Sequence, residues 1–306
     1  MESLRITAGM GDITSYETLV NAGADELFAG FVPFSWNKTY GNLLPLNRRE
    51  VLFYHVQIGT LEDMKILRQK IDRYHIPVTI TFNSLYYVKE QLPVIADYIR
   101  DLSALGFSDY IIADINLIRY LSKHRIPCRI HISGEIGEWN EYTLRLLLSL
   151  SNDTTRITRI IFHRKTDYRD IARCVSVGRS LDPALEFEAF CMNENCHYTG
   201  GYCNSLHCDE MVHLCQLEYR LSPQVSVPAA EYNDEEEDIP GETGCGLCAI
   251  EDLQALGITH LKVVGRGLSP ECVARDIQAV KEVLRTGDPS LFRTKCHHAC
   301  YYQKRV

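Results

Sequence analysis

Clustered cysteines are the residues of this chain whose type and spacing most directly suggest chemistry. The chain has 306 residues and 12 cysteines; ten of these fall between Cys191 and Cys300, and the first 127 residues contain none. Four lie in one short stretch, "EAFCMNENCHYTGGYCNSLHC". Thiolates are ligands of Zn²⁺ and of iron–sulfur clusters, and in a reducing compartment clustered cysteines more often bind metal or perform redox chemistry than form disulfides. The sequence therefore predicts a metal site.

The spacing of these cysteines leaves the kind of metal site open. Cys245 and Cys248 form a C-x₂-C pair typical of zinc sites, and Cys296 and Cys300 form a C-x₃-C pair. Wider spacing suits a cubane cluster, whose ligands come from several directions. The widely spaced cysteines are Cys196, Cys203, Cys208 and Cys215. The nearby histidines that keep zinc open are His207, His213, His297 and His298.

Polar residues recur at the ends of successive predicted strands and form a second set of candidates. The candidate catalytic residues are Asp114, Glu135, Arg164 and Glu188; the carboxylates could act as acid or base. The candidates for substrate binding are Asn83, Ser133, Lys262 and Arg266. The two arginines could hold an anion through bidentate contacts. Any one of these residues could equally be a surface residue or a strand-end cap, but their recurrence favours a common site. We expect His131 to be a buried, hydrogen-bonded core histidine.

An alternation of β-rich and helical patterns must position these residues. The expected strands are 4–9, 25–32, 76–83, 108–114, 126–134, 157–164, 184–190 and 258–265. The expected helices are 14–24, 50–74, 91–106, 116–125, 140–150, 167–179, 249–257 and 269–285. The last of them begins with Ser269 as cap and Pro270 in the first turn.

About eight β/α repeats of this length predict an α/β protein with a TIM-like (β/α)₈ barrel, in which functional residues lie at the C-terminal ends of the strands. A doubly wound open sheet is the alternative. No G-x-G-x-x-G follows the first strand, so a dinucleotide site has no support. We expect a single barrel domain over 1–306, a Cys-rich metal-binding insertion at 191–248 after the seventh strand, and a Cys/His-bearing tail at 295–306.

Composition and charge restrict the classes of partner. The formal net charge is −8, and no dense Lys/Arg run is visible, which argues against a nucleic-acid partner. No apolar run approaches the ~20 residues that a membrane span needs, and the N-terminal residues lack the pattern of a signal peptide. We therefore expect a cytoplasmic protein without a membrane partner.

Three stretches resemble segments of one known family. They are "LKVVGRGLSPECVARDIQAVKEVL", with a Lys-x-x-Gly-Arg before a Ser-Pro-Glu helix start; "CAIEDLQALGITH", which opens with Cys; and "EAFCMNENCHYTGGYC", with two cysteines seven positions apart. Weaker similarities cover the N-terminal half. The chain resembles the U32 family, the collagenase-like peptidases.

This resemblance implies a TIM-like barrel and an iron–sulfur enzyme of oxygen-independent hydroxylation or a related modification. The substrate would be a small molecule, a peptide or RNA, and the net charge argues against RNA. The resemblance implies a [4Fe–4S] cluster on Cys196, Cys203, Cys215 and Cys248, with zinc as the alternative. It also implies a small anionic molecule such as prephenate as oxygen donor, and a protein partner of the same family.

Several positions depart from the family's pattern. Glu135 stands where the family has a strand-end Gln, and Val264 stands where it has a Glu in Lys-x-Glu-Gly-Arg. The surplus cysteines, which could serve a second cluster or remain free thiols, are Cys191, Cys208, Cys245, Cys296 and Cys300. Two other functions stay open. One is a metallopeptidase, although no H-E-x-x-H is present. The other is a non-catalytic barrel that is stapled by metal or carries a cluster as a partner subunit.

Overall fold

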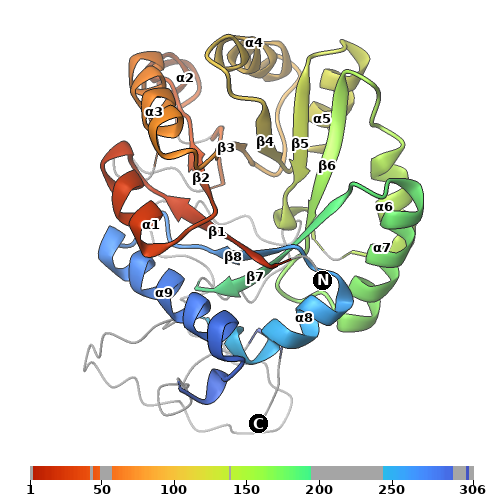
Figure 1. The fold of residues 1–306 in the computed structure, drawn as a ribbon. Helices are drawn as coiled ribbons and strands as arrows, with labels where there is room; N and C mark the ends of the chain where they lie inside the picture. The colour runs from red at the N-terminus through yellow and green to blue at the C-terminus, as the bar shows by residue number, and fades with distance from the viewer. Residues whose placement is uncertain are drawn as a thin grey trace, which may run out of the picture.

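Eight parallel strands close into a barrel in the computed structural model, which describes residues 3–41, 44–48, 57–137, 139–193, 244–291 and 301–302. The strands are β1 (Arg5–Met10), β2 (Glu26–Gly30), β3 (Val78–Phe82), β4 (Asp109–Ile112), β5 (Cys128–Ile132), β6 (Thr155–Ile161), β7 (Glu186–Met192) and β8 (His260–Val263). Each strand pairs with its neighbours in chain order, and β1 pairs with β8, so the sheet has no edge (Figure 1). The (β/α)₈ prediction is confirmed and the open-sheet alternative is wrong.

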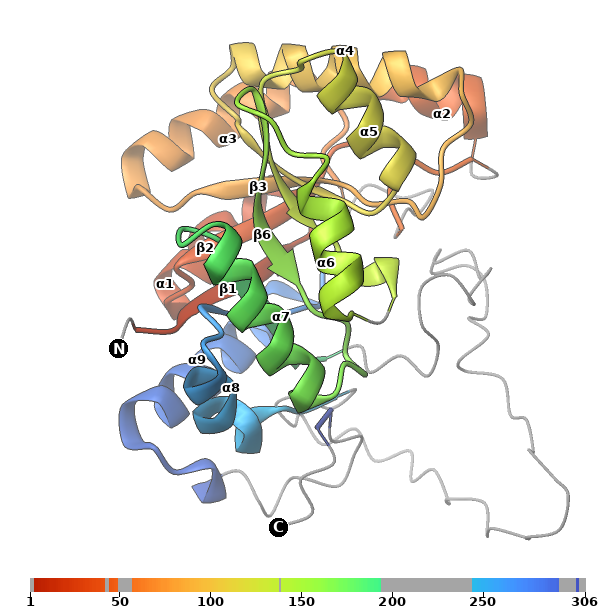
Figure 2. The same cartoon turned by 90° about the vertical axis from the view of Figure 1, so that its right-hand side faces the viewer.

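Helices surround the barrel and cover the outward faces of its strands (Figures 1 and 2). They are α1 (Tyr16–Ala22), α2 (Phe34–Tyr40), α3 (Leu61–Tyr74), α4 (Gln91–Ala104), α5 (Ile115–Lys123), α6 (Glu141–Leu148), α7 (Tyr168–Leu181), α8 (Ile250–Leu256) and α9 (Pro270–Thr286). All eight expected strands and all eight expected helices overlap an observed element. The expected helix 50–74 is correct for α3, and residues 50–56 lie outside the described residues. Helix α2 was not expected. None of the described helices has the length and apolar character that a membrane crossing requires.

Side-chain caps explain where several helices begin. Thr60 accepts a hydrogen bond from the backbone N–H of Asp63 at the start of α3, and Asn140 accepts from two N–H groups at the start of α6. Ser269 caps α9 through the N–H of Cys272, and Pro270 occupies its first turn, as the sequence predicts. These caps satisfy donors that a helix start otherwise leaves without intrahelical partners.

Two layers of different chemistry fill the barrel. One contains charged side chains, including Glu26, Arg159, Glu188 and Lys262, each no more than 6% exposed. The other is a small buried apolar cluster separate from the main core. The five members of this cluster that lie on or next to the strands are Phe28, Ile111, Ile161, Phe190 and Val264, and we call them the apolar floor; the sixth member is Tyr301. Because a floor residue follows the charged residue of the same strand by two positions in β2 and β7, the floor lies nearer the C-terminal ends of the strands.

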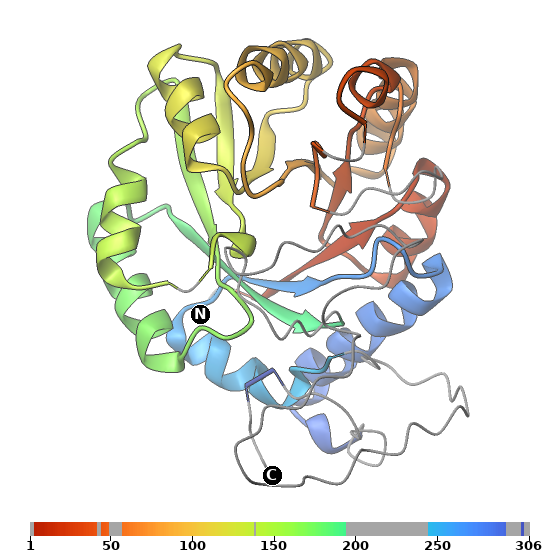
Figure 3. The ribbon, with the colours of Figure 1, turned by 180° about the vertical axis from the view of Figure 1, so that it is seen from behind.

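Residues 194–243, which make up most of the predicted Cys-rich insertion at 191–248, lie outside the described residues. Of the predicted tail at 295–306, the structure describes Tyr301 and Tyr302. Figure 3 shows the barrel from the face opposite to that of Figure 1, with β7, β8, α8 and α9 side by side below its centre. The described ends of the insertion are Asn193, after β7, and Gly244, before α8.

Candidate functional site at the barrel mouth

The C-terminal ends of the strands bring several predicted residues together, and we call this region the barrel mouth. Arg164, which follows β6, donates from Nη1 to Oε1 of Glu135, which follows β5, at 3.0 Å. Arg48 approaches the same carboxylate, with its Nε 3.7 Å from Oε2. Burial by itself raises the pKa of Glu135, but the charges of Arg164 and Arg48 outweigh it and lower the pKa to about 2. Glu135 is therefore an anion that holds two guanidinium groups, and it is poorly suited to donate a proton near neutral pH.

A second cationic group, Arg266, lies across the mouth after β8. Its Nη1 donates to Thr81 Oγ1 at 3.2 Å, and its guanidinium carbon lies 6.0 Å from the ring centroid of Phe28. A Cβ at Gly30 would lie 2.6 Å from the same Nη1, so a residue without a side chain is needed there to admit the arginine in this position. Arg266 is 6% exposed. The mouth thus gathers arginines from three loops.

Two cationic side chains, Arg164 and Lys262, lie over aromatic rings of the apolar floor. The guanidinium carbon of Arg164 lies 4.0 Å from the ring centroid of Phe190, and Lys262 Nζ lies 3.9 Å from that of Phe28. A cation over an aromatic ring is attracted by the ring's quadrupole, the more so when water is excluded. Guanidinium groups bind carboxylates through paired hydrogen bonds, and aromatic rings contact apolar groups, so side chains of these two types together can recognise a small anion with an apolar body.

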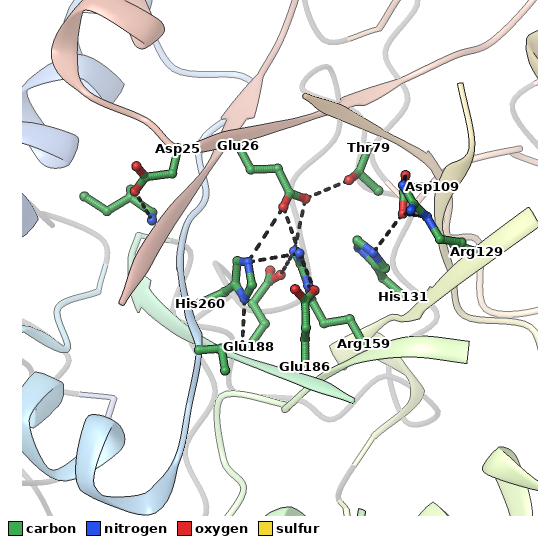
Figure 4. A network of polar contacts seen from close by, with 12 residues as sticks. Asp25, Glu26, Thr79, Asp109, Arg129, His131, Arg159, Glu186, Glu188 and His260 are labelled. Atoms are coloured by element: carbon green, nitrogen blue, oxygen red, sulfur yellow. Dashed lines mark hydrogen bonds and ion pairs between the residues drawn. The ribbon is translucent and has the colours of Figure 1, made fainter. Parts of the chain in front are cut away.

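The charged layer below the floor is an ion-pair network centred on Arg159 (Figure 4). Nη1 of Arg159 donates to Glu26 Oε1 and to Glu188 Oε2, both at 3.0 Å, and Nη2 contacts Glu186 Oε2 at 2.8 Å. Lys262 Nζ donates to the other oxygen of Glu188 at 2.5 Å. We call these five residues the charge network. It spans β2, β6, β7 and β8, so it ties strands from opposite parts of the sequence together.

The charges of this network fix the protonation states of its members. Burial raises the pKa of Glu188, but Lys262 and Arg159 overcome it and lower that pKa to about 2. Burial lowers the pKa of Lys262, and Glu188 opposes that shift. Burial and the charge of Arg159 lower the pKa of the adjacent His260 to about 4. Glu188 is 0% exposed and accepts hydrogen bonds from Arg159 on one oxygen and from Lys262 on the other. These contacts place Glu188 where it can orient Lys262.

Three predicted residues are engaged with the backbone at the strand ends. Asp114 caps α5 through the N–H of Asn116 and also accepts from the N–H of Tyr87, both at 2.6 Å. Burial raises the pKa of Asp114. Ser133 accepts from the N–H of Glu135 at 3.2 Å, and Asn83 accepts from the N–H of Arg48 at 3.0 Å. These contacts shape the loops that carry Glu135 and Arg48.

His131, as expected, is a buried histidine; its Nε2 lies 3.5 Å from Asp109 Oδ1.

Sequence reasoning missed Arg48, Arg159 and the aromatic floor. A charged residue inside the apolar run "ITRIIF" is a usable signal for Arg159, because a buried charge requires a partner. Arg48 carries no comparable signal, since it lies in an irregular stretch after β2. Phe28 and Phe190 look like ordinary core residues until the barrel shows which strand face points inward.

The end of β7, the segment 244–246 and Tyr301 form a junction of short backbone pairings. The N–H of Asn193 donates to the carbonyl of Gly244 at 2.7 Å, and the N–H of Gly246 donates to that of Cys191 at 2.7 Å. The N–H of Tyr301 donates to the carbonyl of Cys245 at 3.1 Å. Asn193 Nδ2 also donates to Asp276 Oδ2 of α9 at 2.5 Å. The 50-residue segment 194–243 thus begins and ends at one place beside the mouth.

Three described cysteines lie at or near this junction, and they differ in their exposure. Cys245 and Cys248 are partly exposed, whereas burial raises the pKa of the Cys191 thiol well above its ordinary value. Within the described ranges, no three His, Cys, Asp or Glu side chains are grouped so that they could hold a metal ion. The other predicted ligands, Cys196, Cys203 and Cys215, and the surplus cysteines Cys208, Cys296 and Cys300 lie outside the described residues.

The fold and the mouth define a protein of the (β/α)₈ barrel class with several arginine side chains at the C-terminal ends of its strands. The chain belongs to peptidase family U32, whose family model matches residues 11–298. No curated protein sequence matches the chain significantly.

Solved structures align with most of this chain at low sequence identity. The U32 peptidase Mk0906 aligns with a TM-score of 0.49 and 9% identity, over 87% of this chain and 94% of its own. A putative dihydrodipicolinate synthetase from Pseudomonas aeruginosa aligns with a TM-score of 0.45 and 10% identity, over 95% and 80%. A 2,3-dimethylmalate lyase aligns with a TM-score of 0.44 and 14% identity, over 97% and 90%.

Proposed function

We propose that this U32 protein is an iron–sulfur enzyme that binds a small anion in its barrel mouth and supports an oxygen-independent hydroxylation or a related modification. The observation that carries the proposal is the position of the mouth. Arg164 lies over the floor residue Phe190 and shares Glu135 with Arg48, and Arg266 lies 6.0 Å from the ring of Phe28. Phe190 belongs to β7, and the cysteine-bearing segment leaves the barrel at the end of this strand. The family resemblance supplies the reaction class.

Each described group has a role in this proposal. Arg164 and Arg266 bind the anion, for example the carboxylates of a molecule such as prephenate, and Glu135 holds Arg164 and Arg48 in place. Lys262, which Glu188 orients, places a positive charge beneath Phe28. Asp114 remains a candidate acid, since burial favours its neutral form.

Cys248 and the three cysteines of the segment, Cys196, Cys203 and Cys215, are the proposed holders of a [4Fe–4S] cluster, with zinc as the alternative. A cluster there would supply electron transfer next to the bound anion. A partner subunit of the same family is part of this proposal, and a cytoplasmic location is proposed because thiolates remain reduced there.

Anaerobic purification followed by iron, sulfide and zinc analysis tests the cofactor. We expect about four irons and four sulfides per chain, lost in Cys248→Ala. About eight of each would bring the surplus cysteines into a second site. One zinc without sulfide would contradict the enzyme proposal and favour the metal-stapled barrel.

A further inference from the structure

Tyr301, near the C-terminal end of the chain, lies on the apolar floor of the barrel mouth. Tyr301 is 7% exposed and belongs to the same buried cluster as the five floor residues, which come from β2, β4, β6, β7 and the end of β8. Residues on five inward-facing positions of a closed barrel surround its axis. Tyr301 belongs to this cluster and its backbone is bonded to Cys245 beside the end of β7, so its side chain packs on the floor at the C-terminal end of the barrel.

Several contacts hold Tyr301 and its neighbour Tyr302 in place. The N–H of Tyr301 donates to the carbonyl of Cys245 at 3.1 Å, and Tyr302 Oη donates to the carbonyl of Phe190 at 2.8 Å. The ring of Tyr302 stacks on that of Tyr168, with centroids 5.4 Å apart and planes 10° apart. The two residues are thus attached to β7, to the junction and to α7 at once.

The junction has the shape that these two rings require. A Cβ at Gly246 would lie 3.1 Å from the carbonyl oxygen of Cys191, 3.2 Å from the ring of Tyr302 and 3.3 Å from that of Tyr301. A glycine at this position permits the close approach of both rings. The Tyr301 ring and the junction backbone therefore form one packed unit at the edge of the mouth.

Access to the floor is restricted on its other sides. The barrel wall has no edge, and the charge network fills the interior below the floor. A molecule from solvent therefore reaches the floor from the mouth, where Tyr301 lies. We propose that Tyr301 is a specificity-determining residue of the barrel mouth, whose ring limits the size of the molecules that reach the floor. This inference shares one assumption with the proposed function, namely that a ligand binds in the mouth.

A reporter thiol in the floor tests this inference without knowledge of the ligand. Val264→Cys places a thiol among the floor residues with little change in volume, and peptide mass spectrometry separates its alkylation from that of the native cysteines. The full chain is treated with iodoacetamide and with a bulky fluorescein-bearing iodoacetamide. In the Val264→Cys background we expect Tyr301→Ala to raise both labelling rates, by about tenfold for the small reagent and more for the bulky one.

Matched variants keep the result interpretable. Tyr301→Phe, which keeps the ring, should label like the parent, and Tyr301→Leu should give intermediate rates. Tyr86→Ala removes a 65% exposed tyrosine from the loop after β3, at the same end of the barrel, and should change neither rate. Circular dichroism and thermal unfolding report whether each variant stays folded, and Tyr301→Leu replaces Tyr301→Ala if the latter does not.

Two results would overturn the proposal. The first is equal labelling rates in the parent and in folded Tyr301→Ala or Tyr301→Leu. The second is a rise that is the same for small and bulky reagents, since that would show general loosening and no size limit. The ratio of the iodoacetate labelling rate to the iodoacetamide labelling rate at the Val264→Cys thiol tests the proposed function separately from the size limit. Iodoacetate is an anion and iodoacetamide is neutral, so this ratio reports the electrostatic potential at the thiol. If Arg164→Gln leaves this ratio unchanged while Tyr301→Ala still raises the rates, anion binding fails and the size limit stands.

Discussion

The barrel mouth and the charge network are both built from arginine–glutamate contacts, but two arginines share one glutamate in the mouth, whereas three glutamates contact one arginine in the network. In the network, Arg159 and Lys262 face three carboxylates, of Glu26, Glu186 and Glu188. In the described part of the mouth, Glu135 is shared by Arg164 and Arg48, and Arg266 lies nearby on Thr81. A buried charge network is costly to break, because removal of one partner leaves an uncompensated charge. In the mouth, the guanidinium of Arg164 lies over the ring of Phe190, where its charge contributes to the electrostatic potential.

Removal of the central cation should separate the two regions most clearly. Arg159→Met leaves Glu26 buried without its main partner and Glu188 with Lys262 alone, so we expect the free energy of unfolding to fall by about 3–5 kcal/mol. Urea unfolding at pH 7 measures it. The matched change in the mouth, Arg164→Met, should cost clearly less. An equal loss for both variants would remove the distinction between network and mouth.

Acid should weaken the network through Glu188. The pKa of Glu188 in the folded protein is about 2, below the ordinary value of 4.5. Its contribution to stability is therefore present above pH 4.5 and is lost as the pH falls toward 2. Urea unfolding between pH 6 and pH 3 should show a steeper decline in the parent than in Glu188→Gln. Parallel curves would mean that Glu188 has an ordinary pKa in the folded state.

Loss of a cation from the mouth should change the local electrostatic potential more than the stability of the protein. Arg164→Gln removes a cation over Phe190, and we expect the iodoacetate-to-iodoacetamide ratio at Val264→Cys to fall by about threefold to tenfold. High salt should reduce the ratio of the parent toward that of the variant. Arg129→Gln, which removes an exposed arginine paired with Asp109 far from the mouth, is the control and should leave the ratio unchanged.

The smallest expected effect tests how precisely the mouth is shaped. Gly30→Ala places a Cβ against Nη1 of Arg266, the far end of a flexible side chain that can move away. We expect a loss of stability of about 1 kcal/mol or less and a measurable change in the iodoacetate ratio. A large loss of stability with an unchanged ratio would show that Arg266 is part of the fold rather than of the anion site.

Local sequence patterns were sufficient for the fold and for part of the site. Near-continuous apolar strands, Gly-terminated helices and the Ser269 cap act over a few residues, so they can be read in a single chain. Because Glu135, Arg164 and Arg266 each follow a predicted strand, the sequence placed all three at the C-terminal end of the barrel. The seven-residue helix α2 was missed because so short a segment carries too few turns to show a period.

The rest depends on contacts between residues far apart in the chain. Arg159 and Glu26 are separated by 133 positions, and no local pattern connects them. The same holds for Tyr301, which meets the floor only because the barrel closes. Sequence reasoning assigned acid–base roles to Glu135 and Glu188 from residue type, while the partners that lower their pKa values came from other strands. The predicted metal ligands on 194–243 stay predictions.

The hydrogen bond between Asn193 and Gly244 joins the two points at which the cysteine-bearing segment is attached to the barrel. Because the chain leaves and re-enters the barrel at atoms 2.7 Å apart, the barrel imposes no length on what lies between them. Doubling the length of a loop closed in this way costs only about 0.6 kcal/mol in chain entropy. A graft of this segment onto the same two attachment points of a related barrel, or its replacement by a short turn, should leave eight strands to close as before. The chemistry of the mouth could then be varied on a constant scaffold.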